Sequence, residues 1–154
     1  DVLLSVRSVS KDGTGLSETP ASEMDISYRK TPFMTNGRIV TAAYFQLKPG
    51  KREDILGRMT ELMNKRKASQ PLDYPSAGST FKRPVGHFAG QLIEQAGLKG
   101  TSVGAAQVSE KHAGFLINRG GATCDDMLRL IELVQNRVRE QFGVELECEV
   151  RIVK

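Results

Sequence analysis

The spacing of hydrophobic residues changes along the chain, from strand-like in the first third to mixed in the remainder. Residues 2–9 (VLLSVRSV) and 38–47 (RIVTAAYFQL) are rich in β-branched and aliphatic side chains, and turn-forming residues bound both runs. We therefore predict a strand in each. After residue 50 the period becomes helical, which predicts a helix over residues 52–67. One face of this helix carries the apolar residues Ile55, Met59, Leu62 and Met63.

Residues 70–78 (QPLDYPSAG) interrupt the periodic segments and predict a loop that is also a candidate domain boundary. A short helix should follow and end at Gly97, because glycine is the common stop after a helix C-terminus. Its apolar face comprises Phe88, Leu92, Ile93 and Ala96. Residues 103–108 and 115–118 are predicted to form short strands.

The strongest helix prediction begins after Thr123 and ends at Gly143. Thr123 is a good N-cap, and two aspartates in the first turn favour the positive end of the helix dipole. The apolar stripe comprises Met127, Leu130, Ile131, Val134 and Val138. Residues 145–153 (ELECEVRIV) then alternate with the period of a strand. Helices and strands in this order predict an α+β fold.

Length and composition are those of an ordinary soluble globular protein. The chain has 154 residues, of which 39% are hydrophobic and 26% are charged. A chain of this size needs no disulfide or metal to hold a core. No apolar run approaches the roughly 20 residues of a membrane helix, so we expect a cytoplasmic protein without a membrane partner. The first residue is Asp1, with no signal or transit sequence after it, and this start leaves room for a missing N-terminal part.

The formal net charge of +4 suits a nucleic acid, an anionic membrane or a small anionic ligand. The one dense basic cluster, residues 65–67, lies at the end of a predicted helix, where the dipole favours cations. Aromatic residues do not alternate with the cations as stacking platforms would, which disfavours nucleic acid. Cys124 and Cys148 lack metal-ligand spacing, so we predict no metal site and reduced, buried cysteines.

The segment 75–84 (PSAGSTFKRP) carries the first candidate for chemistry. Gly78 can adopt backbone angles that present the hydroxyl of Ser79 at a cleft, and Lys82 and Arg83 could attract an anion. The alternative is an ordinary surface turn. A hydrolase nucleophile elbow is excluded, because the second glycine and the strand-to-helix frame of that motif are missing.

Three further sites each have a structural alternative. Glu149 and Arg151 share a face of the predicted last strand and could form a charged pair in a cleft, or simply a solvated surface. Arg29, after Tyr28, could bind a carboxylate or phosphate through its guanidinium fork, or be surface charge. His112, between a turn and a strand, is more often structural than catalytic. From the residues alone we expect a basic, soluble α+β domain that binds an anion, and its function stays open.

Four motifs, in order, carry a resemblance to a known family. They are residues 70–84 (QPLDYPSAGSTFKRP), 86–93 (GHFAGQLI), 108–118 (VSEKHAGFLIN) and 146–151 (LECEVR). The chain resembles the C-terminal half of UDP-N-acetylenolpyruvoylglucosamine reductase (MurB), a bacterial flavoenzyme of peptidoglycan synthesis and hence of cell-wall biogenesis, cell shape and division. The match is strongest over residues 70–153. It is most similar to the shorter class II, since the longer class's tyrosine-bearing insertion is absent.

The resemblance implies an NADPH-dependent FAD oxidoreductase that converts UDP-N-acetylglucosamine-enolpyruvate to UDP-N-acetylmuramate. In the family, reduced flavin gives a hydride to the enolpyruvyl C3, and a serine then protonates C2; that serine matches Ser79. Glu149 and Arg29 match the pair that lies by the substrate carboxylate and stabilises the enolate. Glu149 is expected to be protonated or hydrogen-bonded then, because a bare carboxylate would repel the enolate.

The resemblance also implies residues that contact the substrate, which carries a diphosphate and a carboxylate. They are Tyr28, Arg66, Gly78, Arg83, His112 and Arg151. Position 83 is asparagine in the longer class, so we expect the diphosphate or sugar to be held differently at Arg83. No metal is implied.

The family's glycine-rich flavin-binding half is missing from the chain. We therefore expect residues 1–69 to be the remainder of a PCMH-type FAD-binding subdomain. Residues 70–143 should be the substrate-binding domain, and residues 144–154 a closing strand toward the flavin-binding part. Such a fragment should be inactive and bind little or no flavin, with its cofactor contacts unknown. The alternative is a stand-alone, non-catalytic module that binds a nucleotide sugar.

Overall fold

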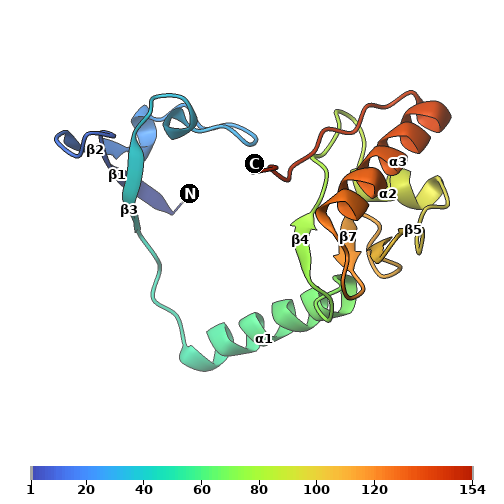
Figure 1. The fold of residues 1–154 in the computed structure, drawn as a ribbon. Helices are drawn as coiled ribbons and strands as arrows, with labels where there is room; N and C mark the ends of the chain where they lie inside the picture. The colour runs from blue at the N-terminus through green and yellow to red at the C-terminus, as the bar shows by residue number, and fades with distance from the viewer. Residues whose placement is uncertain (1, 154) are drawn as a thin grey trace. The chain divides into compact units, whose positions relative to one another are not determined.

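The computed structural model describes residues 2–153, and these divide into two compact units, residues 2–55 and 56–153. The first unit is built on a three-stranded antiparallel sheet in the order β2-β1-β3 (Figure 1). Its strands are β1 (Leu3–Val9), β2 (Leu16–Pro20) and β3 (Ile39–Phe45). Short 3-10 turns, η1 (Ala21–Glu23) and η2 (Pro32–Met34), lie between β2 and β3. The two strands predicted in this region are confirmed.

Arg38 links β1 to the turn before β2 through hydrogen bonds. Arg38 donates from Nε to the hydroxyl of Ser8 at 2.8 Å and from Nη2 to the Ser8 carbonyl at 3.0 Å, and it also reaches the carbonyl of Gly15. Ser8 is fully buried, so the guanidinium satisfies polar groups that burial would otherwise leave without water.

The predicted helix after residue 50 is present as α1 (Arg52–Ser69). The residues of the predicted apolar stripe do lie in a helix. None of the described residues of α1 is buried, however. Met59, for example, keeps 60% of its surface exposed and Leu62 48%. The periodicity therefore predicted the helix correctly, but it did not predict that the apolar side chains would be exposed.

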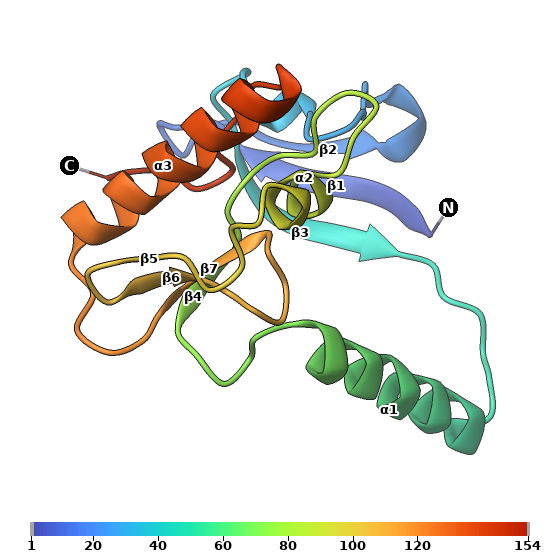
Figure 2. The same ribbon diagram turned by 90° about the vertical axis from the view of Figure 1, so that its right-hand side faces the viewer.

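The second unit contains a four-stranded antiparallel sheet in the order β4-β7-β6-β5. Its strands are β4 (Ser76–Ser79), β5 (Ser102–Val103), β6 (Ala106–Val108) and β7 (Phe115–Asn118). The helices are α2 (Ala89–Gln95) and α3 (Cys124–Phe142), and α3 packs against α2, β5 and β6 (Figure 2). Helices and strands are thus mixed as the α+β prediction requires, and that prediction is confirmed.

Two predictions for this sheet need correction. The predicted strand over residues 103–108 is a hairpin of β5 and β6, because Gly104 takes a positive φ of 55° at the turn. The predicted loop over residues 70–78 ends early, because its last residues pair with β7 as β4. A strand this short carries too few alternating positions to be recognised from its sequence.

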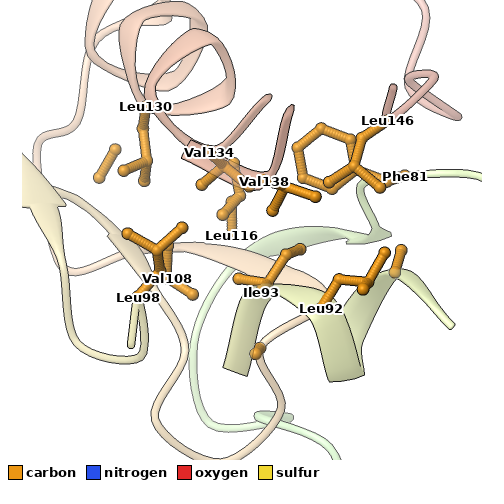
Figure 3. Packing of buried hydrophobic residues seen from close by; sticks show 13 residues of the cluster. Phe81, Leu92, Ile93, Leu98, Val108, Leu116, Leu130, Val134, Val138 and Leu146 are labelled. Carbon is orange, nitrogen blue, oxygen red and sulfur yellow. The ribbon is translucent and has the colours of Figure 1, made fainter. Parts of the chain in front are cut away.

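The main hydrophobic core lies between the sheet and the two helices (Figure 3). From α3 it takes Leu130, Val134 and Val138, each with no exposed surface. Ile93 of α2 and Val108 of β6 are equally buried. The predicted apolar face of α3 is therefore the one that builds the core, and burying each such side chain contributes roughly 1.5–3 kcal/mol.

Both ends of α3 match their prediction. The Thr123 hydroxyl accepts the Asp126 N–H at 3.1 Å, and the Asp126 carboxylate accepts the Thr123 N–H at 2.9 Å, which is a capping box. Gly143 ends the helix with a positive φ of 67°, and its N–H donates to the carbonyl of Arg139 at 2.9 Å.

The predicted last strand over residues 145–153 is wrong. The segment makes a single antiparallel bridge, between Phe81 and Cys148, and no strand is assigned to it within the described residues. Leu146 is buried in the core, whereas Val153 keeps 92% of its surface exposed. The alternating pattern was real, but a strand requires a partner ladder, and here the pairing stops after Glu149.

Candidate active site

Ser79 is the last residue of β4, an edge strand of the second sheet, and pairs in register with Phe115 of β7. Gly78 before it takes a φ of 84°, so the predicted unusual backbone at this glycine is confirmed. The side chain of Ser79 is exposed, and its hydroxyl lies 3.4 Å from the carbonyl of Phe81. Ser79 thus stands at a strand end, not in the surface turn that was the alternative.

A cavity of about 670 Å³, here called the large cavity, lies beside Ser79 within the second unit. It is lined by Arg66, Gln70, Pro71, Leu72, Tyr74, Pro75, Ser76, Gly78, Ser79, His112 and Phe115. Four of these residues, Arg66, Gly78, Ser79 and His112, were expected at the site from the sequence. The chain therefore brings together residues from the end of α1, from β4 and from the approach to β7.

The large cavity opens on the side of the sheet away from α2 and α3. Leu116 of β7 belongs to the core under the helices, so its neighbours Phe115 and Ile117 point to the opposite face. Phe115 lines the large cavity, and Ile117 lines a second cavity of about 190 Å³, here called the small cavity. The loop that precedes β4 covers this face and forms walls of both cavities.

His112 is held in one orientation. Its Nδ1 accepts the N–H of Gly114 at 3.1 Å, and its ring meets Phe115 edge-on with the centroids 4.9 Å apart. A Cβ added to Gly90 or Gly114 would lie within 3.1–3.3 Å of the ring carbon Cε1. Since Nδ1 accepts, the neutral ring carries its proton on Nε2, and His112 is one of the residues that line the large cavity.

Arg66 supplies the positive charge of the large cavity. It lies in the last turn of α1, and its Nε donates to the side-chain carbonyl of Gln70 at 3.0 Å. The guanidinium is exposed and retains further N–H groups for a ligand. A cation that is held at one side in this way is suited to a phosphate or carboxylate.

Glu149 reaches the neighbourhood of Ser79 through backbone pairing. Its N–H donates to the carbonyl of Thr80 at 2.8 Å, and the N–H of Lys82 donates to the carbonyl of Glu147 at 2.8 Å. The residue is half-buried, and the Oε2 atom of its carboxyl group is buried. Gln135 of α3 secures the same segment, donating to the carbonyl of Leu146 at 2.7 Å.

The other cations expected near the site make different contacts. Lys82 forms an ion pair with Glu147, and the guanidinium of Arg83 lies 4.0 Å from the ring centroid of Phe88. Arg151 is exposed in the C-terminal segment. Neither Arg83 nor Arg151 is among the residues that line the large cavity in the described part of the chain.

Tyr28 and Arg29 lie in the first unit, at the tip of a tight turn. Ser27 and Lys30 exchange backbone hydrogen bonds of 3.1 and 3.0 Å across it. Arg29 has a φ of 58°, which is rare for a residue with a side chain and stores strain that often marks functional turns. Its guanidinium lies 5.6 Å from the ring centroid of Tyr28.

Both cysteines are free thiols, but Cys124 is exposed, so the expectation of two buried cysteines is wrong for that residue. Cys124 is the first residue of α3, so it lies at the helix end, before the first residue of that helix that packs on the core, and is exposed there. Burial raises the pKa of the Cys148 thiol. Among residues 2–153 no cluster of three or more His, Cys, Asp or Glu side chains could hold a metal ion, and no helix is long and apolar enough to span a membrane.

The sequence did not single out Gln70, Tyr74, Ser76 and Phe115 as site residues, although all four line the large cavity. The first two lie in the loop that was assigned only as a boundary. Phe115 could have been identified, because it alternates with the core residue Leu116 along a short central strand. For Ser76 and Gln70 no sequence signal distinguishes a cavity wall from an exposed loop.

The structure defines the class of protein as an α+β domain whose cavity carries a hydroxyl, an imidazole and a guanidinium, groups that are suited to an anionic ligand. The family model described as UDP-N-acetylenolpyruvoylglucosamine reductase, C-terminal domain, matches residues 70–153. This covers more than half of the chain, which therefore belongs to the UDP-N-acetylenolpyruvoylglucosamine reductase family.

Individual relatives agree with this family. The chain is 58% identical to the UDP-N-acetylenolpyruvoylglucosamine reductase of Clostridium novyi over 131 residues, covering 85% of this chain and 43% of that protein. It is 48% identical to that of Syntrophomonas wolfei over 153 residues, covering 99% of this chain and 51% of that protein. The crystal structure of the Thermus caldophilus reductase matches with a TM-score of 0.79 and 38% identity, over 99% of this chain and 54% of that one. The chain spans about half the length of the curated relatives it matches.

Proposed function

We propose that this chain is the C-terminal part of a UDP-N-acetylenolpyruvoylglucosamine reductase and that its large cavity binds UDP-N-acetylglucosamine-enolpyruvate. The observation that carries the proposal is the convergence of Arg66, Gly78, Ser79 and His112 on one cavity of about 670 Å³. These residues are spread over almost fifty positions of the sequence, and the family resemblance implies a ligand contact or a catalytic role for each. A cavity of this volume is ordinary for a ligand of this size.

Charge and hydrogen bonding support an anionic ligand in this cavity. Arg66 offers a guanidinium fork to a phosphate oxygen, and His112 offers its Nε2–H while Gly114 occupies Nδ1. Ser76 and Ser79 add hydroxyls at the same wall. In the proposal, Arg66 binds the diphosphate and His112 donates to a neighbouring oxygen of the substrate.

In the catalytic part of the proposal, Ser79 donates a proton to C2 of the enolpyruvyl group. A serine hydroxyl is a poor acid in water, but an enolate carbon is a strong base and can take its proton. In the proposal, the bound substrate and the rest of the parent shield the exposed Ser79 from water. Glu149 and Arg29 stabilise the enolate, the arginine through its positive charge. The strained backbone of Arg29 supports a functional rather than a purely structural turn.

The proposal assigns the cofactor chemistry to the part of the parent that is not in this chain. FAD, reduced by NADPH, would supply the hydride there. Gly120 and Gly121 form a turn before the N-terminus of α3, the kind of element that can hold a dinucleotide phosphate, but the first turn of α3 carries Asp125 and Asp126, whose negative charges disfavour a phosphate there. The positive-φ glycines of the first unit, Gly13 and Gly37, lie in turns between strands. We therefore derive no flavin contact for the described residues.

Calorimetric titration of UDP-N-acetylglucosamine-enolpyruvate into the 154-residue chain tests the proposal. Binding should weaken about tenfold in Arg66→Met, because a charge-assisted hydrogen bond to a phosphate is lost. Arg129→Met, an exposed arginine of α3 that does not line the cavity, is the matched control and should bind normally. Equal affinity in both variants, or no binding by the unchanged chain, would contradict the proposed site.

The alternative is a nucleotide-sugar binding module without catalysis. It is favoured by the location of the whole large cavity in residues 66–115, which need no further segment to line it. The two proposals differ in the parent gene. Coding sequence for a flavin-binding half upstream of residue 1, in frame, supports the reductase, whereas a start codon a few codons upstream of Asp1 supports the module.

A further inference from the structure

Tyr74 lines both the large cavity and the small cavity. Arg119 lines only the small one. Its Nη1 donates to the Tyr74 hydroxyl at 2.8 Å, and its guanidinium carbon lies 4.8 Å from the ring centroid. Tyr74 thus lies, with Pro71, at the boundary that the two cavities share, and Arg119, a residue of the small cavity, contacts its ring and hydroxyl.

Arg119 and the loop that bears Tyr74 are each held in place by backbone hydrogen bonds. Arg119 follows β7 directly, and its backbone N–H donates to the carbonyl of Ala105 at 2.9 Å. The loop bearing Tyr74 is anchored at the buried Pro71 and by the N–H of Asn118, which donates to the carbonyl of Pro75 at 2.9 Å. A ring held at its hydroxyl and along its loop loses little further conformational entropy when a ligand packs on it.

Tyr74 is also the aromatic side chain of the large cavity that remains available. Phe115, the other large aromatic residue of the lining, is buried to 8% exposure and packs against His112. Tyr74 keeps 38% of its surface exposed. A flat, preorganised aromatic surface near a guanidinium that can bind phosphate matches the two recognition elements of a nucleotide, its base and its phosphates.

We propose that the ring of Tyr74 is the stacking surface for the base of the nucleotide and that Arg119 is the positioning residue that holds it. This inference rests on the proposed function, because it assigns the base end of the same ligand. It also gives Arg119, a cation outside the large cavity, a role in ligand selectivity that does not require contact with the ligand.

The test compares UDP, pyrophosphate and N-acetylglucosamine 1-phosphate as probes in calorimetric titrations of the 154-residue chain. In Tyr74→Leu the affinity for UDP should fall about tenfold, the usual effect of losing one stacked base. The affinities for pyrophosphate and N-acetylglucosamine 1-phosphate should stay within twofold of the unchanged chain. Arg119→Met should show the same selective loss for UDP, and Tyr74→Phe a smaller one, because the ring remains but its hydrogen bond is gone.

Tyr44→Leu is the matched control. Tyr44 on β3 also packs under an arginine, with the Arg7 guanidinium 5.1 Å from its ring centroid, and it does not line the large cavity. The Tyr44→Leu variant should bind all three probes with the affinity of the unchanged chain. An unchanged affinity for UDP in Tyr74→Leu, an equal loss for UDP and pyrophosphate, or a loss confined to N-acetylglucosamine 1-phosphate would overturn the inference. Failure of the unchanged chain to bind UDP would overturn the proposed function and this inference together.

Discussion

The backbone N–H of Glu149 donates to the carbonyl of Thr80 at 2.8 Å. This bond joins the C-terminal segment to the residue after Ser79, across nearly seventy positions of sequence. Backbone hydrogen bonds therefore connect the segment after Ser79, the proposed proton donor, with the segment of Glu149, whose carboxyl group is proposed to stabilise the enolate. The arrangement depends on the segment 146–149 remaining in place, although that segment is not part of a sheet.

The proposed role of Ser79 predicts a step-specific defect. In the intact parent reductase, Ser79→Ala should leave flavin reduction by NADPH unchanged and slow substrate-dependent flavin reoxidation by about 10²–10⁴-fold, the usual contribution of a positioned general acid. Ser76→Ala removes another hydroxyl of the same cavity wall and is the control. Stopped-flow absorbance of the flavin separates the two half-reactions. Unchanged reoxidation in Ser79→Ala would exclude the proton-donor role.

Gln135 should control how firmly the Glu149 segment is held. Its side chain donates to the carbonyl of Leu146 at 2.7 Å from a half-buried position. Replacing it with leucine leaves that carbonyl without its partner. We expect the amide N–H groups of Lys82 and Glu149 to exchange with deuterium about tenfold faster, as expected when about 1.4 kcal/mol of local stability is lost.

The control for this prediction is Gln141→Leu, an exposed glutamine on the same helix. It should leave the exchange of both amides unchanged. If Gln135→Leu and Gln141→Leu gave the same exchange rates, the Gln135 hydrogen bond would have no part in holding the segment.

The capping box of α3 predicts a pH-dependent contribution to stability. The Thr123 backbone N–H, and then the Thr123 hydroxyl, hold the pKa of Asp126 below its ordinary value of 3.8. A carboxyl group with a lowered pKa in the folded state stabilises the fold above its unfolded pKa, and this contribution is lost as the pH falls through the folded pKa. Asp126→Asn should therefore be less stable than the unchanged chain at pH 7, and the difference should shrink below pH 3.8.

Urea unfolding at pH 7 and at decreasing pH measures this difference in the free energy of unfolding. Asp125→Asn is the control, since Asp125 lies in the same helical turn but outside the capping box. It should show a smaller difference at pH 7. A difference for Asp126→Asn that persists unchanged at the lowest pH would show that the carboxylate charge is not the cause.

The sequence was most informative where the local signal and the tertiary packing agree. Thr123, the apolar stripe through Leu130 and Val134, and Gly143 each favour the same helix, and α3 has the predicted ends and core face. Gly78 likewise required a backbone that glycine adopts easily. The resemblance to the family supplied most of the residues proposed for the site, because spacing alone could not connect Arg66 with His112.

The remaining features depend on partners that are distant in sequence. The alternation over residues 145–153 could not reveal that the pairing ends after Glu149. The stripe on α1 could not reveal that Met59 would be exposed in this chain. Tyr74 looked like a loop residue because its contact with Arg119 joins positions 45 residues apart. Periodicity reports which side of an element is apolar, and it does not report which element lies against it.

The most direct test of the central claim is the mapping of amide chemical-shift changes on titration of the 154-residue chain with UDP-N-acetylglucosamine. The account predicts that the largest changes occur in residues 70–79 and 112–115, around the large cavity, with the Arg66 side chain also affected. Shift changes confined to residues 2–55, or no change at millimolar ligand, would contradict it.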